Sequence, residues 1–162
     1  MSVNPIHHIS LSVTSLENSL TFYRDILGMK VTLESTIDDS AHIEYLKLQP
    51  GTSARVAMLQ VGPSLGAVQL IEWSNTKKLD QPIRPGSPGI FLIAFELSDE
   101  TIDEILSRLA TYKIYPWSEP KSSFIMRYGN IRTVVIEDPD GVMVEFLELP
   151  SKESIQLLRS LD

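Results

Sequence analysis

Two stretches of this chain share one pattern: Val68-Gln69-Leu70-Ile71-Glu72-Trp73 and Val144-Glu145-Phe146-Leu147-Glu148-Leu149. A turn that contains glycine precedes each stretch, and each stretch closes a half of the chain that opens with a predicted strand and helix. The two openings also align, His8-Ile9-Ser10-Leu11-Ser12-Val13 with Leu92-Ile93-Ala94-Phe95-Glu96-Leu97. This repetition predicts one supersecondary unit that is used twice.

The repetition places four side chains in equivalent positions. Gln69 of the first copy matches Glu145 of the second, and His8 matches Leu92. We expect such positions to meet across a pseudo-twofold axis. Histidine, glutamine and glutamate side chains can bind a metal ion, whereas a leucine side chain cannot.

The bulk composition narrows the classes of function. A chain of 162 residues that is 43% hydrophobic supports one domain with a proper core, and each half alone would be marginal. The net charge of −7 opposes nucleic-acid binding, and the lack of cysteine excludes disulfides and zinc–thiolate sites. No apolar run reaches the roughly 18 residues of a membrane span, and the first residues lack a signal-peptide pattern. We expect a cytoplasmic protein that binds a small organic molecule rather than a nucleic acid or a membrane.

In the first half, the alternation over residues 6–13 predicts a strand with His8, Ser10 and Ser12 on one face. A helix is expected to follow, with Ser15 as its N-cap and Gly28 at its end. Further strands are predicted over residues 30–36, 41–48, 55–61 and 68–73. The prolines between residues 74 and 88 predict an extended linker.

The second half is expected to repeat this order. A strand over residues 90–97 precedes a helix that Ser98 or Asp99 is expected to cap. Residues 124–128 and 131–136 predict a hairpin about Gly129-Asn130, and a strong turn at 138–141 precedes the last strand. The tail, residues 151–162, carries Ile155, Leu158 and Leu161 on one helical stripe, which predicts a helix that caps its own domain or contacts a second subunit.

The order and spacing of these motifs resemble the vicinal oxygen chelate superfamily, which includes glyoxalase I, methylmalonyl-CoA epimerase, extradiol dioxygenases, fosfomycin-modifying enzymes and bleomycin-binding proteins. The resemblance rests on residues 8–13, 22–31 and 138–145. It implies an α+β fold in which two tandem βαβββ modules form one half-open, barrel-like sheet with an internal cleft. The whole chain, 1–162, would be a single domain with modules at about 4–75 and 88–150, a linker at 76–87 and a tail at 151–162.

The resemblance also implies a site. In this superfamily one residue from the first and the last strand of each module points into the cleft, and these positions are occupied here by His8, Gln69, Leu92 and Glu145. Epimerase-like members carry His, Gln, His and Glu, so Leu92 removes one donor. We therefore expect no cofactor or a weakly bound divalent metal, held, if at all, by His8, Gln69 and Glu145.

Without a metal, His8 and Glu145 would act as catalytic acid and base near neutral pH, and Gln69 would orient a substrate oxygen. An ordinary hydrogen bond within the sheet is the alternative role of Gln69. The expected substrate-binding residues share the cleft and are mostly apolar: Ser10, Ser12, Ile71, Trp73, Leu92, Glu96, Met143, Leu147 and Arg127. For Glu96 and Arg127, plain solvent-exposed positions are the alternative.

Three functions follow from the resemblance. The first is an enzyme that performs proton transfer or rearrangement on a carbonyl-containing organic substrate, as an isomerase, epimerase, cyclase or lyase. The second is a non-catalytic drug- or metabolite-binding protein of the bleomycin-resistance type, which Leu92 favours. The third is a metal-dependent lyase or dioxygenase with reduced coordination. A homodimer is also expected, because an open sheet edge and the apolar stripe of the tail both favour a partner.

Overall fold

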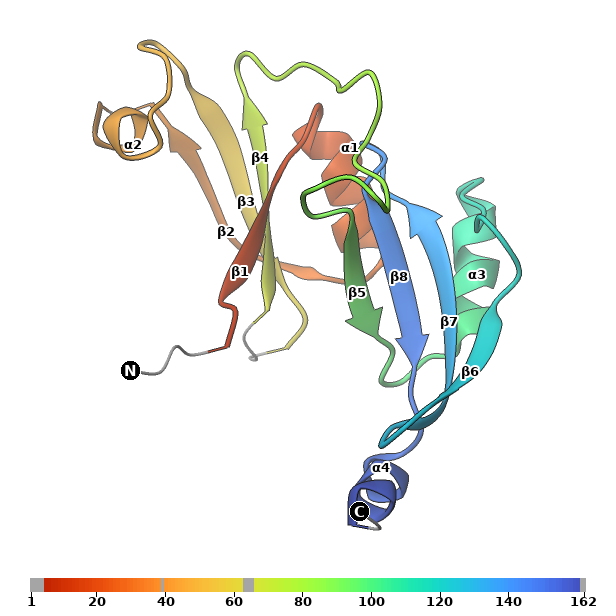
Figure 1. Ribbon diagram of the computed structural model, residues 1–162. Coiled ribbons are helices and arrows are strands. Elements are labelled where there is room, and N and C mark those ends of the chain that lie inside the picture. The colour runs from red at the N-terminus through yellow and green to blue at the C-terminus, as the bar shows by residue number, and fades with distance from the viewer. Residues whose placement is uncertain (1–4, 39, 63–65, 161–162) are drawn as a thin grey trace. The chain divides into compact units, whose positions relative to one another are not determined.

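The computed structural model describes residues 5–38, 40–62 and 66–160. The chain forms two compact units, Met1–Asp80 and Gln81–Asp162. Each unit contains one four-stranded mixed sheet with a helix packed on one face (Figure 1), which confirms the α+β class and the repeated module. Of the described helices, none has both the length and the apolar character that crossing a membrane requires.

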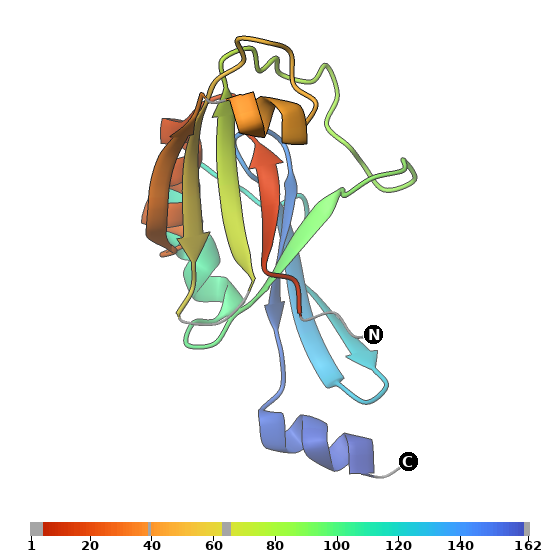
Figure 2. The ribbon, with the colours of Figure 1, turned by 90° about the vertical axis from the view of Figure 1, so that its left-hand side faces the viewer.

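The first unit runs through seven elements in order: β1 (His8–Ser12), α1 (Leu16–Leu20), the π-helical segment η1 (Thr21–Ile26), β2 (Lys30–Ile37), α2 (Ser40–Tyr45), β3 (Ala54–Gln60) and β4 (Ala67–Trp73). Its strands lie in the order β1-β4-β3-β2 (Figure 2), with β1 parallel to β4 and the other pairs antiparallel. Fully buried side chains of η1 and the sheet, among them Phe22, Tyr23, Leu59 and Leu70, form the core. Burial of such large apolar groups is the main force that holds the helix to the sheet.

Both predicted ends of the first helix are confirmed. Ser15 caps α1, because its Oγ accepts a hydrogen bond from the backbone N–H of Asn18 at 3.3 Å. Gly28 follows the helix with φ +76°, the left-handed conformation that glycine adopts without strain. Between these ends the helix widens into the π-turn of η1, and the N–H of Met29 donates to the carbonyl of Tyr23.

The prediction of a strand over residues 41–48 is wrong. The structure has the helix α2 at Ser40–Tyr45, followed by a turn in which Lys47 takes φ +53°. Alternation over so short a run does not separate a strand from a helical turn. A strand also needs a neighbouring strand for its N–H and C=O groups, whereas a helical turn pairs them locally; the N–H of Leu46 donates to the carbonyl of His42.

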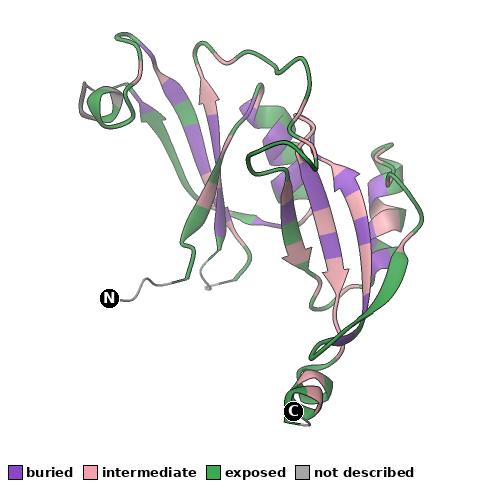
Figure 3. Ribbon diagram, in the orientation of Figure 1, coloured by how far each residue is buried: buried purple, intermediate pink, exposed green. Residues whose placement is uncertain are grey.

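The second unit contains β5 (Leu92–Glu96), α3 (Ile102–Thr111), β6 (Lys121–Ile125), β7 (Gly129–Glu137), β8 (Met143–Glu148) and α4 (Lys152–Ser160). Its strands lie in the order β5-β8-β7-β6, the order of the first sheet. The face of β7 and β8 beneath α3 is buried (Figure 3), and Ile102, Ile105 and Leu109 of α3 pack there.

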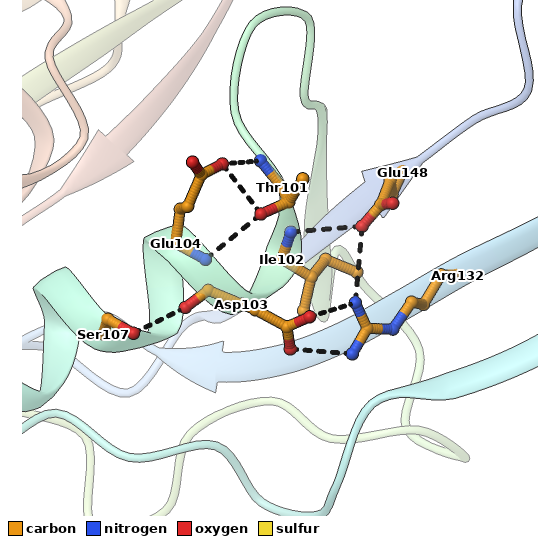
Figure 4. Close-up of polar contacts among 7 residues, drawn as sticks. All are labelled: Thr101, Ile102, Asp103, Glu104, Ser107, Arg132 and Glu148. Atoms are coloured by element: carbon orange, nitrogen blue, oxygen red, sulfur yellow. Dashed lines mark hydrogen bonds and ion pairs between the residues drawn. The ribbon is translucent and has the colours of Figure 1, made fainter.

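The cap of α3 differs from the prediction. Thr101, and not Ser98 or Asp99, precedes the helix, and it forms a capping box with Glu104 (Figure 4). Of Ser98, Asp99 and Thr101, only Thr101 is followed by a glutamate three residues later, so only Thr101 can form a capping box. The backbone N–H and the hydroxyl of Thr101 both donate to the Glu104 carboxylate at 2.8 Å, and these hydrogen bonds lower the pKa of Glu104.

Ion pairs fasten the start of α3 to its sheet (Figure 4). The guanidinium of Arg132 donates to both carboxylate oxygens of Asp103 at 2.8 Å, and this contact lowers the pKa of Asp103. Glu148 accepts a hydrogen bond from the backbone N–H of Ile102 at 3.1 Å. These contacts lie on the helix-covered face of the sheet.

The predicted hairpin exists, but its turn lies earlier. β6 ends at Ile125, the turn is Met126-Arg127-Tyr128, and Gly129 already belongs to β7. Gly129 is needed for packing, because a Cβ there would lie 3.1 Å from Leu158 of α4 and 3.3 Å from Pro150. The predicted tail helix is confirmed as α4, with Ile155 and Leu158 half-buried; Leu161 lies outside the described residues.

Candidate functional site

The two sheets share one pairing register at the predicted site positions. Ser10 of β1 lies opposite Gln69 of β4, and Ala94 of β5 lies opposite Glu145 of β8. His8 and Leu92 each stand two residues before these partners on the first strand of their sheet. The register thus gives His8 the same place in the first sheet that Leu92 has in the second.

On the first sheet, the predicted polar residues pair with one another. The hydroxyl of Ser10 donates to Oε1 of Gln69 at 2.7 Å, and the indole Nε1 of Trp73 donates to Oγ of Ser12 at 3.1 Å. Ile71 lies between Gln69 and Trp73 on β4 and packs into an apolar cluster on the same face. His8 is exposed at the start of β1, and its Nδ1 lies 2.9 Å from Nδ1 of His7.

On the second sheet, Glu145 is a half-buried carboxyl on an apolar face. Ala94 and Val135 lie opposite it on the flanking strands, and Met143 and Leu147 lie on the same face of β8. Burial raises the pKa of Glu145. Among the described residues none forms a hydrogen bond or an ion pair with this side chain. When ionised, a carboxyl group in such surroundings is a stronger base than one in water, and when protonated it can return the proton.

The remaining predicted residues lie farther along the second sheet. Leu92 is half-buried opposite Met143, and Glu96 is exposed opposite Leu147. Arg127 lies in the β6–β7 turn, with φ +69°. Six residues of β7 separate Gly129 from Val135, the partner of Glu145, which is about 20 Å of strand. The sheet therefore does not bring Arg127 beside Glu145.

Arg55 on the first sheet forms ion pairs with two glutamates. Its guanidinium lies 2.5 Å from Glu17 of α1 and 3.3 Å from Glu72 of β4. These contacts lie on the helix-covered face of the first sheet, opposite to the face of Gln69. Arg55 therefore has the ordinary role of a surface ion-pair residue.

One cation near Glu145 was missed by sequence reasoning. Arg84 lies in the proline-rich segment that precedes β5, and it pairs with Glu137 of β7. Its guanidinium lies 5.0 Å from the ring centroid of Trp117. The one signal in the sequence was its place between Pro82 and Pro85, which stiffen the chain around it.

Comparison with known proteins agrees with this duplicated architecture. The sequence profile of the Glyoxalase/Bleomycin resistance protein/Dioxygenase superfamily matches residues 5–146. The chain belongs to this superfamily. The solved glyoxalase family protein from Bacillus cereus has the same fold, with a TM-score of 0.76, 16% identity, and coverage of 93% of this chain and 97% of that chain.

Two curated relatives have names that refer to enzymes. The lactoylglutathione lyase-like protein terB of Aspergillus terreus is 24% identical, over 93% of this chain and 78% of its own. The 2-epi-5-epi-valiolone epimerase of an Actinomyces species is 22% identical, over 90% of this chain and 80% of its own.

The residues of this superfamily member do not fit the four-donor metal site that its motifs resemble. Leu92 has no donor atom, and the carbonyl oxygen of Gln69 already accepts the hydroxyl of Ser10. Within either unit, the described residues hold no group of three His, Asp or Glu side chains suited to a metal ion. The three remaining donors, His8, Gln69 and Glu145, are expected to bind a divalent cation more weakly than four donors would, because such a cation prefers four to six ligands.

Proposed function

We propose that this superfamily member catalyses proton transfer or rearrangement on a small carbonyl-containing substrate, as an isomerase, epimerase, cyclase or lyase. The observation that carries the proposal is Glu145: a half-buried carboxyl on an apolar sheet face, with no partner among the described residues. Burying an unpartnered carboxyl costs stability, so a purely structural role does not account for it. The names of the two curated relatives, a lyase-like protein and an epimerase, fit this class of reaction.

In the proposed reaction, the ionised carboxylate of Glu145 takes a proton from the carbon next to the substrate carbonyl. Burial raises the pKa of Glu145 and so makes its carboxylate a stronger base than one in water. Protonation of the same carbon from the opposite face needs a second group, the role proposed for His8, whereas the protonated Glu145 carboxyl can return its proton to a different atom. The first outcome is epimerisation and the second is isomerisation.

Gln69 is the proposed donor to the substrate oxygen. Its Oε1 accepts the hydroxyl of Ser10, which fixes the orientation of the amide and leaves both N–H groups of Nε2 available. An N–H donor stabilises the negative charge that develops on a carbonyl oxygen when the adjacent carbon loses a proton. His8 is the proposed general acid, because a protonated imidazole donates from either ring nitrogen. We propose that these steps need no metal, because Leu92 removes one of the four donor positions.

The direct test is exchange of substrate protons with solvent. A panel of small aldehydes, ketones and oxo acids is incubated with the protein in D₂O, and loss of the C–H signal next to the carbonyl is followed by NMR. We expect exchange with at least one compound, and a loss of about 100-fold or more in Glu145→Gln. Glu153→Gln, at an exposed carboxylate of α4 in the same unit, is the matched control and should retain the rate. Full exchange in Glu145→Gln would refute the role of Glu145.

The second candidate is a binding protein without catalysis. The apolar surroundings of Glu145, with Leu92, Met143 and Leu147 on the same face, favour it. In that case a ligand would be recovered unchanged and undeuterated after binding. The same D₂O incubation therefore separates the two candidates.

A further inference from the structure

Arg84 is held in a defined position by three contacts within the second unit. Its Nη1 donates to the backbone carbonyl of Gly141 at 2.8 Å, and its Nη2 pairs with the carboxylate of Glu137. Its guanidinium carbon lies 5.0 Å from the ring centroid of Trp117, a cation–π distance. The segment itself is fixed at this turn, because a Cβ on Gly141 would lie 2.6 Å from Pro82.

These contacts place Arg84 on the sheet face that carries Glu145. Glu137 lies opposite Met143, and Val135 lies opposite Glu145, so Glu137 is a diagonal neighbour of Glu145 on the same face. Diagonal neighbours of this kind are about 7–8 Å apart. Trp117 belongs to the same region, because its backbone N–H donates to the carbonyl of Val135 at 3.1 Å.

The Arg84 guanidinium has capacity to bind a further group. It offers five N–H donors, and its two hydrogen-bonded contacts with described residues use one donor on each terminal nitrogen. The side chain is 33% exposed and Trp117 is 51% exposed, so solvent and solutes reach both. If these contacts served only to fix the linker, Arg84 would not need unused N–H donors next to the half-exposed indole of Trp117.

We propose that Arg84 and Trp117 bind the anionic group, a carboxylate or a phosphate, of the substrate. Arg84 donates from its open edge, Glu137 and Gly141 hold the guanidinium in place, and the indole packs against the substrate's carbon chain. Planar guanidinium groups suit both anions, because they donate two parallel hydrogen bonds. The inference rests on the proposed function for the carbonyl part: the substrate is then a carbonyl compound whose anionic group lies several bonds from the reacting carbon.

The test compares two probes that differ in charge, 5-oxohexanoate and its methyl ester. Isothermal titration calorimetry of the otherwise unmodified protein measures the affinity for each probe. We expect the anion to bind about tenfold more tightly than the ester, the size of one charge-assisted hydrogen bond. Arg84→Gln should abolish this preference and Arg84→Lys should retain part of it. Equal affinity for the two probes, or an unchanged preference in Arg84→Gln, would overturn the proposal.

Arg132→Gln is the matched control. Arg132 lies on the opposite face of the same sheet, pairs with carboxylates as Arg84 does, and is 32% exposed. It should cost stability and leave the probe preference unchanged. If Arg84→Gln fails to fold, rising salt provides a second measurement on the unmodified protein: the preference for the anion should decline with ionic strength, and a salt-independent preference would contradict a charge contact.

Glu145→Gln separates this proposal from the proposed function. Binding of 5-oxohexanoate that survives in Glu145→Gln, together with loss of proton exchange, supports both. Exchange that persists in Glu145→Gln while the preference still depends on Arg84 overturns the catalytic role of Glu145 and leaves the anion site standing.

Discussion

Glu145 takes its chemical character from neighbours that cannot hydrogen-bond to it. Ala94 and Val135 flank it across the sheet, and Met143 and Leu147 flank it along β8. The corresponding residue of the first sheet, Gln69, has Ser10 opposite and is hydrogen-bonded to it. Serine at the partner position gives the Gln69 amide oxygen a hydrogen bond, whereas alanine at the equivalent position leaves the Glu145 carboxyl without a protein partner among the described residues.

The pKa shift of Glu145 predicts how stability depends on pH. Burial raises this pKa above its value in the unfolded chain, so the folded protein holds the proton more tightly. The resulting stabilisation is complete below the unfolded pKa and is lost as the pH rises through the folded pKa. Glu145→Gln stays neutral throughout, so it should be more stable than the parent at neutral pH, with a gap that closes in acid. Urea unfolding of both proteins at neutral and at acidic pH measures the difference in unfolding free energy, and a difference that widens in acid would contradict the prediction.

Leu92 is the residue that separates this chain from a four-donor site. We expect Leu92→His to raise the affinity for Ni²⁺ or Co²⁺ by about tenfold or more over the parent, because it places an imidazole on the sheet face that carries the Glu145 carboxylate. Calorimetric titration of protein purified without chelator measures the change. Leu92→Asn, with its weaker ligand, is the control, and an equal affinity in Leu92→His and the parent would contradict this prediction.

At the scale of elements, the cap of α3 gives a prediction. Thr101→Ala removes the acceptor for the Glu104 N–H and the hydroxyl that donates to the Glu104 carboxylate, and should cost about 1 kcal/mol of unfolding free energy. Ser98→Ala and Asp99→Ala, at the positions that the sequence favoured, should change it by less than about 0.5 kcal/mol. Urea unfolding of the three variants decides which residue is the cap.

The ends of the two main helices offer a matched pair of substitutions. Gly28 after η1 and Lys113 after α3 both have positive φ, +76° and +60°. A side chain in that conformation costs roughly 1 kcal/mol. Gly28→Ala should therefore destabilise the protein by about this amount, and Lys113→Gly should stabilise it by up to about 1 kcal/mol. Thermal unfolding measures both, and opposite signs of the two shifts are the expected result.

Local rules predicted the elements whose signals are local. The alternation of His8, Ser10 and Ser12, the Ser15 cap and Gly28 depend on neighbours within a few residues, and all were confirmed. The errors lie where distant contacts decide. The helix at 40–45 lacks a strand partner, and a Cβ at Gly129 would meet Leu158 of α4, about 30 residues farther along the chain.

In the candidate site, too, the residues set by local patterns were predicted and the residue set by distant contacts was missed. The register of Gln69 and Glu145 follows from strand alternation, so the sequence could give it. Arg84 was missed because its position depends on Glu137, Gly141 and Trp117, which are between about 30 and 60 residues away in the chain. No local pattern encodes a contact of that range.

At the scale of the whole molecule, we expect a homodimer formed through β6. This strand is the outermost of its sheet, and Phe124 and Met126 at its end are 66% and 75% exposed. An exposed edge with large apolar side chains favours pairing with a second copy. Sedimentation equilibrium should find a dimer, and Phe124→Lys with Met126→Lys should give a monomer. Leu33→Lys, on the outer strand of the first sheet, should leave the dimer intact; a dimer that survives the β6 changes would contradict the assignment.

The π-turn in η1 is a difference between the helices of the two copies of the module. One residue more separates Ser15 from Gly28 than separates Thr101 from Lys113, although both pairs mark the cap and the end of the equivalent helix. A π-turn holds one residue more than an α-turn. The widened turn therefore accommodates the extra residue inside the helix instead of in a loop, so that the cap and the residue with positive φ mark the two ends of the helix in both modules.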